Sequence, residues 1–212
     1  MSVSQIVEIG AMVSDSGASF ATVVQPTCDS EPSAAAVHGI GWEEMRHGPS
    51  FSVMFERFCA FLQDAEAAAM ATCDDSSDED GDHTQSALPT PAFAPTIVLA
   101  AHNGKRFDGS VLVHECIRNG APVAHLARYK WVDTMDVIRA CSSAGCFKLQ
   151  CLAKEMAARQ GCAHRALDDV VALHDVISWV SEAISVPMPK LLLPFVCDFD
   201  VVASLVDIAA SH

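Results

Sequence analysis

Two short polar segments of the sequence contain residue types that can carry out metal-assisted hydrolysis. The first is AHNGKRFD at residues 101–108, and the second is HRALDD at residues 164–169. A histidine such as His164 can act as a general base near neutral pH, and carboxylates such as Asp108 and Asp169 can bind a hard divalent cation. The chemistry indicated is removal of a proton from water beside a bound metal ion.

The predicted elements around these segments favour this chemistry. Residues 96–101 (TIVLAA) form an apolar run that is typical of a strand buried on both faces. Asp108 follows the carboxyl end of this run, where sites in α/β sheets commonly lie. A helix that starts near Arg165 would place His164 just before it and Asp169 about one turn inside it. A base and a carboxylate would then face one cleft.

Each segment also has a purely structural interpretation. Asn103-Gly104 is a common turn sequence, and Asp108 could be the cap of the following helix. The second segment could be a capped helix with a solvated acidic first turn. These interpretations explain each segment when it is considered alone.

The rest of the chain predicts the order β-β-α-β-α-β-α-α-α, which is an α/β layout. Apolar and β-branched residues at 5–13 and 19–25, separated by the turn signal Asp15-Ser16-Gly17, predict an antiparallel hairpin. Apolar residues at helical spacing predict a helix over residues 49–62. The remaining predicted elements are strands over 96–101 and 129–132, and helices over 108–119, 133–141, 148–160 and 165–184.

These elements predict one domain over residues 1–185 with a C-terminal extension over residues 186–212. An Ala-, Asp-, Ser- and Pro-rich stretch at about 66–94 predicts an acidic insertion, largely disordered from about residue 70. The extension contains the apolar run LLLPFV at 191–196. Packing on the domain and docking of a partner both remain open for this run.

Composition restricts the class of protein. The chain has 212 residues, of which 50% are hydrophobic, enough to bury a core. We find no apolar run long enough for a membrane span and no secretory signal. The nine cysteines include no C-x-x-C pair, which favours reduced, often buried thiols in an intracellular protein of the cytoplasm or nucleus. The net charge of −14 argues against a protein that coats nucleic acid without specificity.

Taken together, the two polar segments make the chain resemble the DEDDh 3′–5′ exonucleases, a family that includes RNase T and the TREX enzymes. AHNGKRFD is similar to the second motif of the family, whose aspartate would be Asp108. HRALDD is similar to the third motif, H-x-A-x-x-D, which assigns its roles to His164 and Asp169. Supporting matches are IVEIGAMV at 6–13 followed by Gly17 and Phe20, His38-Gly39-Ile40, Asp133-Thr134, and Lys148-Leu149-Gln150 with Leu152.

The resemblance implies a ribonuclease H-like mixed sheet flanked by helices and a site for two Mg²⁺ or Mn²⁺ ions. Asp108 and Asp169 would be metal ligands and His164 the catalytic base. Substrate-binding positions would be Asn103, Phe107, Gly39 and Ile40. The implied partner is single-stranded nucleic acid or a 3′ end, with DNA favoured over RNA, and relatives commonly form homodimers. Lys105, Arg106, Arg128, Lys130 and Arg165 could contact the nucleic-acid backbone and are equally well explained as solvated surface.

The resemblance lacks one part of the family pattern, the first motif D-x-E. This motif would lie on a central strand just before the strand at 5–13, and Met1 stands only a few residues ahead of it. We therefore expect a truncated sequence with an incomplete metal site and a missing central strand, so that the chain is weak or inactive by itself. Glu8 belongs to the following strand, where we expect a structural role. The alternatives are a non-catalytic nucleic-acid-binding or scaffold protein, and an unrelated α/β domain with chance matches.

Overall fold

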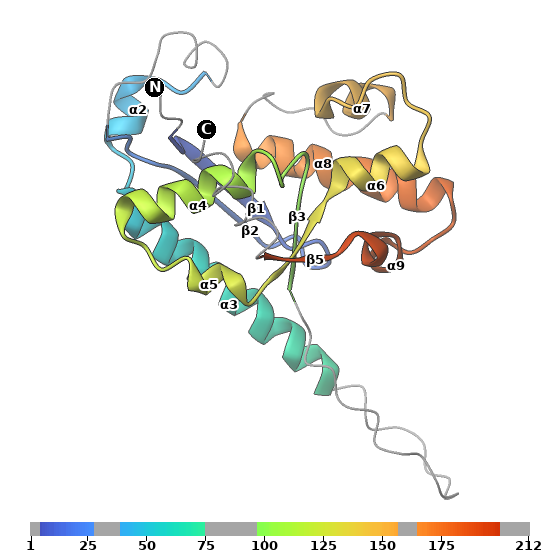
Figure 1. The fold of residues 1–212 in the computed structure, drawn as a ribbon, viewed down its shortest axis with the longest axis horizontal. Coiled ribbons are helices and arrows are strands. Elements are labelled where there is room, and N and C mark those ends of the chain that lie inside the picture. The colour runs from blue at the N-terminus through green and yellow to red at the C-terminus, as the bar shows by residue number, and fades with distance from the viewer. Residues whose placement is uncertain (1–4, 28–38, 75–96, 157–164, 200–212) are drawn as a thin grey trace, which may run out of the picture.

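The structure is a computed structural model that describes residues 5–27, 39–74, 97–156 and 165–199 (Figure 1). Helices and two small sheets alternate along the chain, which confirms the predicted α/β class. In chain order the elements are β1 (Glu8–Met12), β2 (Ser19–Val23), α2 (Trp42–Arg46), α3 (Phe51–Asp74), β3 (Val98–Ala101), α4 (Asp108–Asn119), α5 (Ala124–Ala127), β4 (Lys130–Asp133), α6 (Thr134–Cys141), α7 (Leu149–Glu155), α8 (Ala166–Ala183), α9 (Met188–Leu192), the 3-10 helix η2 (Leu193–Phe195) and β5 (Cys197–Asp198).

The predicted hairpin is present as the antiparallel pair β1 and β2, with Ala11 opposite Phe20. Its turn depends on Gly17, whose φ of 72° lies in the left-handed region that glycine adopts without a steric penalty. The Gly17 N–H donates to the Val13 carbonyl at 2.9 Å, and the Val13 N–H donates to the Ala18 carbonyl at 2.8 Å. The turn signal in the sequence therefore predicted the connection correctly.

The second sheet has the order β3-β4-β5, with β3 parallel to β4 and β5 antiparallel to β4. Among the described residues, β1 and β3 each pair along one edge only, and no strand joins the two sheets. The prediction that β3 is buried on both faces is wrong, because exposed and partly buried residues alternate along it and Val98 is 38% exposed. A strand with one paired edge at the border of a sheet has less protein around it than a central strand.

Helix α3 is longer than the sequence predicted. Its first turns bury Phe51, Met54, Phe55 and Phe58, as the apolar spacing indicated. It then continues past the expected end at residue 62 to Asp74, so residues 66–74, expected in the insertion, are helical. The alanine-rich composition of residues 65–71 explains the extension, since alanine has the highest helix propensity. Residues 75–94 of the expected insertion lie outside the described residues.

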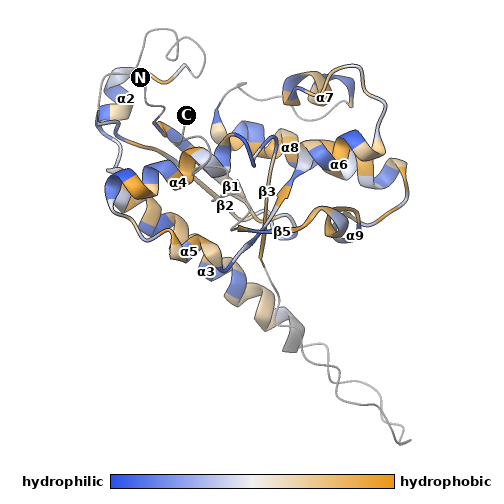
Figure 2. Ribbon diagram, in the orientation of Figure 1, coloured by the Kyte–Doolittle hydropathy of each residue, from blue (hydrophilic) through white to orange (hydrophobic). Residues whose placement is uncertain are grey.

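The buried side chains form two cores. The first joins α3, α4 and the hairpin and includes Trp131, while the second joins α6, α7, α8 and α9 and includes Val132. Neighbouring residues of a strand point to opposite faces, so β4 contributes one side chain to each core. The helices carry apolar and polar residues on different sides, as an arrangement around buried cores requires (Figure 2).

The segment after the expected boundary at residue 185 packs on the rest of the fold. Leu191 of α9 is 4% exposed and belongs to the second core, and Phe199 is 1% exposed and belongs to the first. β5 adds a strand to β4, with Cys197 opposite Trp131. Of the two possibilities left open for the apolar run at 191–196, packing on the domain is therefore observed, although Leu193 remains 68% exposed.

Helix α8 packs against β1, β2, α6, α7 and α9 (Figure 1). Its buried residues are Ala172, Val176, Ile177 and Val180. No single described helix has both the length and the apolar composition to cross a membrane. Taken together, α8 and the segment Met188–Phe195 have the required length and apolar composition, but the two are bent by 94° relative to each other.

We expect Gly10→Ala to lower the free energy of unfolding by about 1 to 3 kcal/mol, the usual cost of overpacking. A Cβ on Gly10 would lie 2.7 Å from the Ala166 carbonyl carbon and 2.8 Å from the Leu167 nitrogen, so α8 would have to move away from β1. Urea denaturation measures the change. Gly145→Ala is the matched control, because its Cβ would meet no atom within 4 Å. Equal effects of the two substitutions would contradict close packing of α8 on β1.

Candidate active site

The two parallel strands β3 and β4 end at the same edge of their sheet, with Ala101 opposite Asp133. Residues 102–107 follow β3 and lead into α4, and α6 follows β4 directly. Helix α8 also begins in this part of the molecule (Figure 1). The carboxyl ends of parallel strands and the amino ends of helices thus meet here, an arrangement that favours negatively charged groups and their ligands.

Asp133 is the buried polar group that organises this edge. The residue is 5% exposed, and its Oδ1 accepts hydrogen bonds from the backbone N–H groups of Asn103 at 2.9 Å and Met135 at 3.1 Å. Its Oδ2 accepts from the N–H of Lys105 at 3.2 Å. The bond to Met135 caps the start of α6, and the other two bonds fix the segment after β3 against that helix start.

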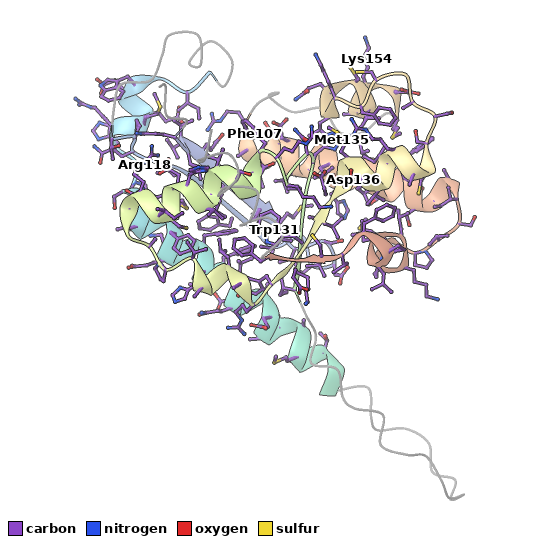
Figure 3. The ribbon with its side chains drawn as sticks, in the orientation of Figure 1. Phe107, Arg118, Trp131, Met135, Asp136 and Lys154 are labelled. Carbon is purple, nitrogen blue, oxygen red and sulfur yellow. The ribbon has the colours of Figure 1, made fainter. Side chains whose placement is uncertain are left out.

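The segment after β3 is a tight turn. Asn103 has a φ of 60°, and its carbonyl accepts hydrogen bonds from Arg106 at 3.2 Å and Phe107 at 3.0 Å. A Cβ on Gly104 would lie 2.6 Å from the Cβ of Ala101, so only glycine lets the turn fold back on the strand. The turn leaves Phe107 64% exposed at the start of α4 (Figure 3).

The structure brings Asp108 and Asp169 close enough to influence each other. The pKa of the Asp108 carboxyl is raised, mainly because surrounding protein atoms desolvate it, and further by the charges of Asp133 and Asp169. A hydrogen bond with its own backbone N–H acts in the opposite direction. The residue as a whole is nevertheless exposed to solvent. Phe107 occupies the cap position of α4, so Asp108 is not the helix cap.

We expect Asp108→Asn to raise the melting temperature at neutral pH in the absence of divalent cations. A carboxyl whose pKa is raised by folding costs stability once it ionises, and asparagine removes that cost. Stability of the original chain falls as pH rises from the ordinary pKa of 3.8 through the raised value, so the advantage of the variant disappears below about pH 3.8. Thermal denaturation across this pH range tests the prediction, with the exposed Asp64→Asn as control. A lower melting temperature for Asp108→Asn at pH 7 would contradict it.

Glu8 has the structural role that the sequence predicted. Its carboxylate accepts hydrogen bonds from Arg165 Nε at 3.0 Å and Nη2 at 2.8 Å, and from the Ala166 backbone N–H at 2.8 Å. A carboxylate from β1 therefore satisfies an otherwise free N–H at the beginning of α8. Arg165 Nη2 also binds Glu44 Oε1 at 3.0 Å, which links α2 to the same helix end.

The two substrate-binding positions predicted before α2 differ in exposure. Gly39 is exposed and has a φ of 67°, a left-handed conformation that suits glycine. Ile40 is 1% exposed, which is typical of a packing residue. Through the Glu44–Arg165 ion pair, the helix that follows them is connected to the start of α8 and so to the neighbourhood of Asp169.

The sequence interpretation assigned no role to His102, which connects three elements. Its Nε2 lies 2.7 Å from the Phe147 carbonyl oxygen, and its Nδ1 lies 3.3 Å from Thr134 Oγ1. A carbonyl can only accept, so Nε2 carries a proton, and in the neutral ring Nδ1 accepts from the threonine hydroxyl. Its position directly after a predicted strand was the only available signal of this role.

The basic residues proposed for nucleic-acid contact are mostly engaged with carboxylates. Lys105 binds Asp136 at 3.1 Å; burial alone would lower the pKa of this lysine, but Asp136, then Cys197 and Asp133, raise it. The other pairs are Arg128 with Glu66, Lys130 with Asp198, and Arg165 with Glu8 and Glu44. These side chains are therefore less available to phosphates than isolated surface cations would be.

His164, the predicted base, lies outside the described residues. Asp108 and Asp169 fit two ligands of a hard cation, since both are carboxylates and the crowding of negative charge at Asp108 is the kind that a cation relieves. Within the described ranges, no three His, Cys, Asp or Glu side chains gather closely enough to hold a metal ion. The described part of the chain thus supplies half of the carboxylates that the resemblance implies.

The chain is similar in structure to solved exonucleases. Exonuclease X in complex with 5′ overhanging duplex DNA superposes with a TM-score of 0.52 and 16% identity over 92% of this chain and 90% of that chain. A full-length 3′-exonuclease superposes with a TM-score of 0.60 and 13% identity over 86% of this chain and 74% of that chain. No protein-family profile matches the sequence, and no curated protein is similar to it by sequence. At these identities the similarity establishes a ribonuclease H-like exonuclease fold.

Proposed function

We propose that the chain is a metal-dependent 3′–5′ exonuclease domain of the DEDDh type, which hydrolyses phosphodiester bonds at nucleic-acid 3′ ends. The observation that carries the proposal is the approach of Asp108 and Asp169, from two helices far apart in the sequence, beside the buried Asp133. This constellation lies at the carboxyl edge of β3 and β4 in an exonuclease fold. Fold and carboxylates together support nuclease chemistry more than either does alone.

In the proposed site, Asp108 and Asp169 hold Mg²⁺ or Mn²⁺. Bound divalent ions would supply an activated water and charge stabilisation at the leaving oxygen. His164 takes the proton of the attacking water. Asp133 positions the turn that leads into Asp108, and Glu8 positions the start of α8, which carries Asp169. The described residues therefore contribute both ligands and the groups that orient them.

The proposed substrate is single-stranded nucleic acid or a frayed 3′ end, with DNA favoured over RNA. Phe107 presents an exposed ring beside Asp108, and aromatic rings stack on bases of any sequence. The DNA-bound Exonuclease X provides a precedent for a nucleic-acid ligand on this fold. Because the nearby cations are paired and the net charge is −14, we propose that attraction of the phosphates depends on the bound metal.

We further propose that residues 1–212 by themselves are weakly active or inactive. Two carboxylates bind a pair of divalent ions less well than the four that the DEDDh pattern contains. Among the described residues, β1 and β3 each pair along one edge only. A non-catalytic nucleic-acid-binding protein is the second candidate, favoured by the lack of a third close ligand within the described ranges.

A nuclease assay tests the proposal. Oligonucleotides of DNA and RNA, labelled at the 5′ end, are incubated with residues 1–212 and with a version extended at its N-terminus by a D-x-E strand. We expect stepwise shortening from the 3′ end with Mg²⁺ or Mn²⁺, none with a chelator, and a faster rate for the extended version. Metal-independent binding without shortening by either protein would favour the second candidate and overturn the exonuclease proposal.

A further inference from the structure

Arg165, the residue directly before α8, binds two carboxylates that differ in burial. Glu8 of β1 accepts hydrogen bonds with both oxygens: Arg165 Nε lies 3.0 Å from Oε1 and 3.2 Å from Oε2, and Nη2 lies 2.8 Å from Oε1. Glu44 of α2 adds a single contact, 3.0 Å from its Oε1 to Arg165 Nη2. The Glu8 side chain is 10% exposed and the Glu44 side chain is 45% exposed. The arginine therefore has an inner partner and an outer partner.

The inner partner has a structural task that the contact with the outer partner does not share. Glu8 also accepts a hydrogen bond from the Ala166 backbone N–H at 2.8 Å, so it fixes the first residue of α8 together with Arg165. The contact with Glu44 is partly exposed, and ion pairs of this kind contribute little to stability. Helix α2 has five residues and buries Met45. Glu44 can therefore leave Arg165 at a small cost, whereas Glu8 cannot.

Arg165 lies one helical turn before Asp169, a proposed metal ligand. The Asp169 backbone N–H donates a hydrogen bond to the Arg165 carbonyl at 3.0 Å, which closes the first turn of α8. Residues four positions apart are neighbours on the surface of a helix. One turn rises about 5.4 Å, on the scale of the distance between neighbouring phosphates of an extended strand. A metal ion on Asp169 that holds the scissile phosphate would therefore place the next phosphate near Arg165.

We propose that Arg165 binds a backbone phosphate of the substrate and that Glu44 is an internal competitor for the same guanidinium nitrogen. The inference rests on the proposed function for the presence of a nucleic-acid strand at this end of α8. In the free protein Glu44 accepts the hydrogen bond from Arg165 Nη2. When a strand binds, a phosphate oxygen takes this place, Glu44 turns to solvent, and Glu8 keeps the arginine in position. Every bound strand must displace a carboxylate, which lowers the affinity of the site.

The test measures binding of a 5′-labelled single-stranded DNA oligonucleotide to the full chain by fluorescence anisotropy. Phosphorothioate linkages at its 3′ end keep the charge and slow hydrolysis, so Mg²⁺ can be present. We expect Glu44→Gln to lower the Kd about two- to fivefold, the range that an exposed ion pair allows. Glu43→Gln is the matched control, because it removes the same charge from the same helix but releases Arg46, 2.9 Å from Glu43, in place of Arg165. The control should change the Kd less.

A second comparison assigns the effect to Arg165. In an Arg165→Gln background, Glu44→Gln should leave the Kd unchanged, because the guanidinium for which Glu44 competes is absent. Circular dichroism verifies that this background is folded. If it is not, Arg165→Lys replaces it, since lysine keeps a charge for Glu8 without the planar fork that reaches two partners, and the gain from Glu44→Gln should be smaller than in the original chain.

The outcomes separate this inference from the proposed function. Equal Kd changes for Glu44→Gln and Glu43→Gln, weaker binding by Glu44→Gln, or an undiminished gain in the Arg165 background would each overturn the competition at Arg165. In those cases the original chain still binds the strand, and the exonuclease proposal stands. If neither the original chain nor any variant binds the oligonucleotide, the exonuclease proposal and this inference fail together.

Discussion

Replacing Asp133 by alanine is expected to lower the free energy of unfolding by about 3 kcal/mol or more, since buried polar groups left without partners cost about 1 to 3 kcal/mol each. The substitution removes the acceptor of three backbone N–H groups, those of Asn103, Lys105 and Met135. Asparagine, which can still accept at one oxygen, should lose less. Urea denaturation of the three proteins gives the order of stability, with the original chain first and the alanine variant last.

The control for this prediction is Asp136→Ala. Asp136 lies in the same helix turn and binds Lys105, but its side chain is 46% exposed. Partly exposed ion pairs contribute about 1 kcal/mol or less, so the control should change stability little. Loss of Asp133 also removes one of the charges that raise the pKa of Asp108, and NMR titration of that carboxyl should show a lower value. If both alanine variants were equally stable, Asp133 would not organise the edge of the sheet.

Replacing Asp108 or Asp169 by asparagine is expected to reduce the rate of 3′-end hydrolysis on the order of a hundredfold or more. Mutation of a residue that only supports a metal ligand already lowers metal affinity or activity about ten- to a hundredfold, and these two residues are proposed as the ligands themselves. The measurement is single-turnover cleavage by the more active of the two versions described above, at several Mg²⁺ concentrations. High Mg²⁺ should recover part of the activity if the lost carboxylate is a metal ligand. Asp108→Asn should therefore combine higher stability without cations with lower activity in their presence.

Asp168→Asn is the matched control for the activity prediction. Asp168 adjoins Asp169 in the first turn of α8, so the two substitutions remove the same charge from the same helix end. Removal of the charge alone would affect both variants equally, whereas a ligand role affects Asp169→Asn far more. Equal rates for the two variants would exclude Asp169 as a ligand and weaken the exonuclease proposal at its central observation.

Much of the fold follows from local patterns in the sequence. The helices at 108–119, 134–141 and 166–183 agree with prediction to within two residues, because their apolar spacing and stop signals lie inside each segment. Gly120, with a φ of 64°, ends α4 where the Asn119-Gly120 pair indicated. Helix α3 was predicted too short because its second half lacks apolar periodicity and is sustained by alanine.

Features that depend on distant residues could not be predicted in the same way. Asp133 bonds to Met135 only two residues away, but its bonds to Asn103 and Lys105 cross 30 and 28 residues. The exposure of β3 depends on which strands lie beside it, which no local pattern encodes. The basic residues appeared available in the sequence, and only the folded chain places Glu66, Asp136 and Asp198 against them.

The position of β4 between the two cores affects how the protein exchanges its amide hydrogens with solvent. Trp131 is packed in one core and Val132 in the other, and the strand is bonded to β3 on one edge and β5 on the other. Opening of one core alone uncovers one face of β4 and leaves the other face packed. Deuterium therefore reaches these amides only when both cores open together, so β4 reports on global unfolding while the outer helices report on local opening.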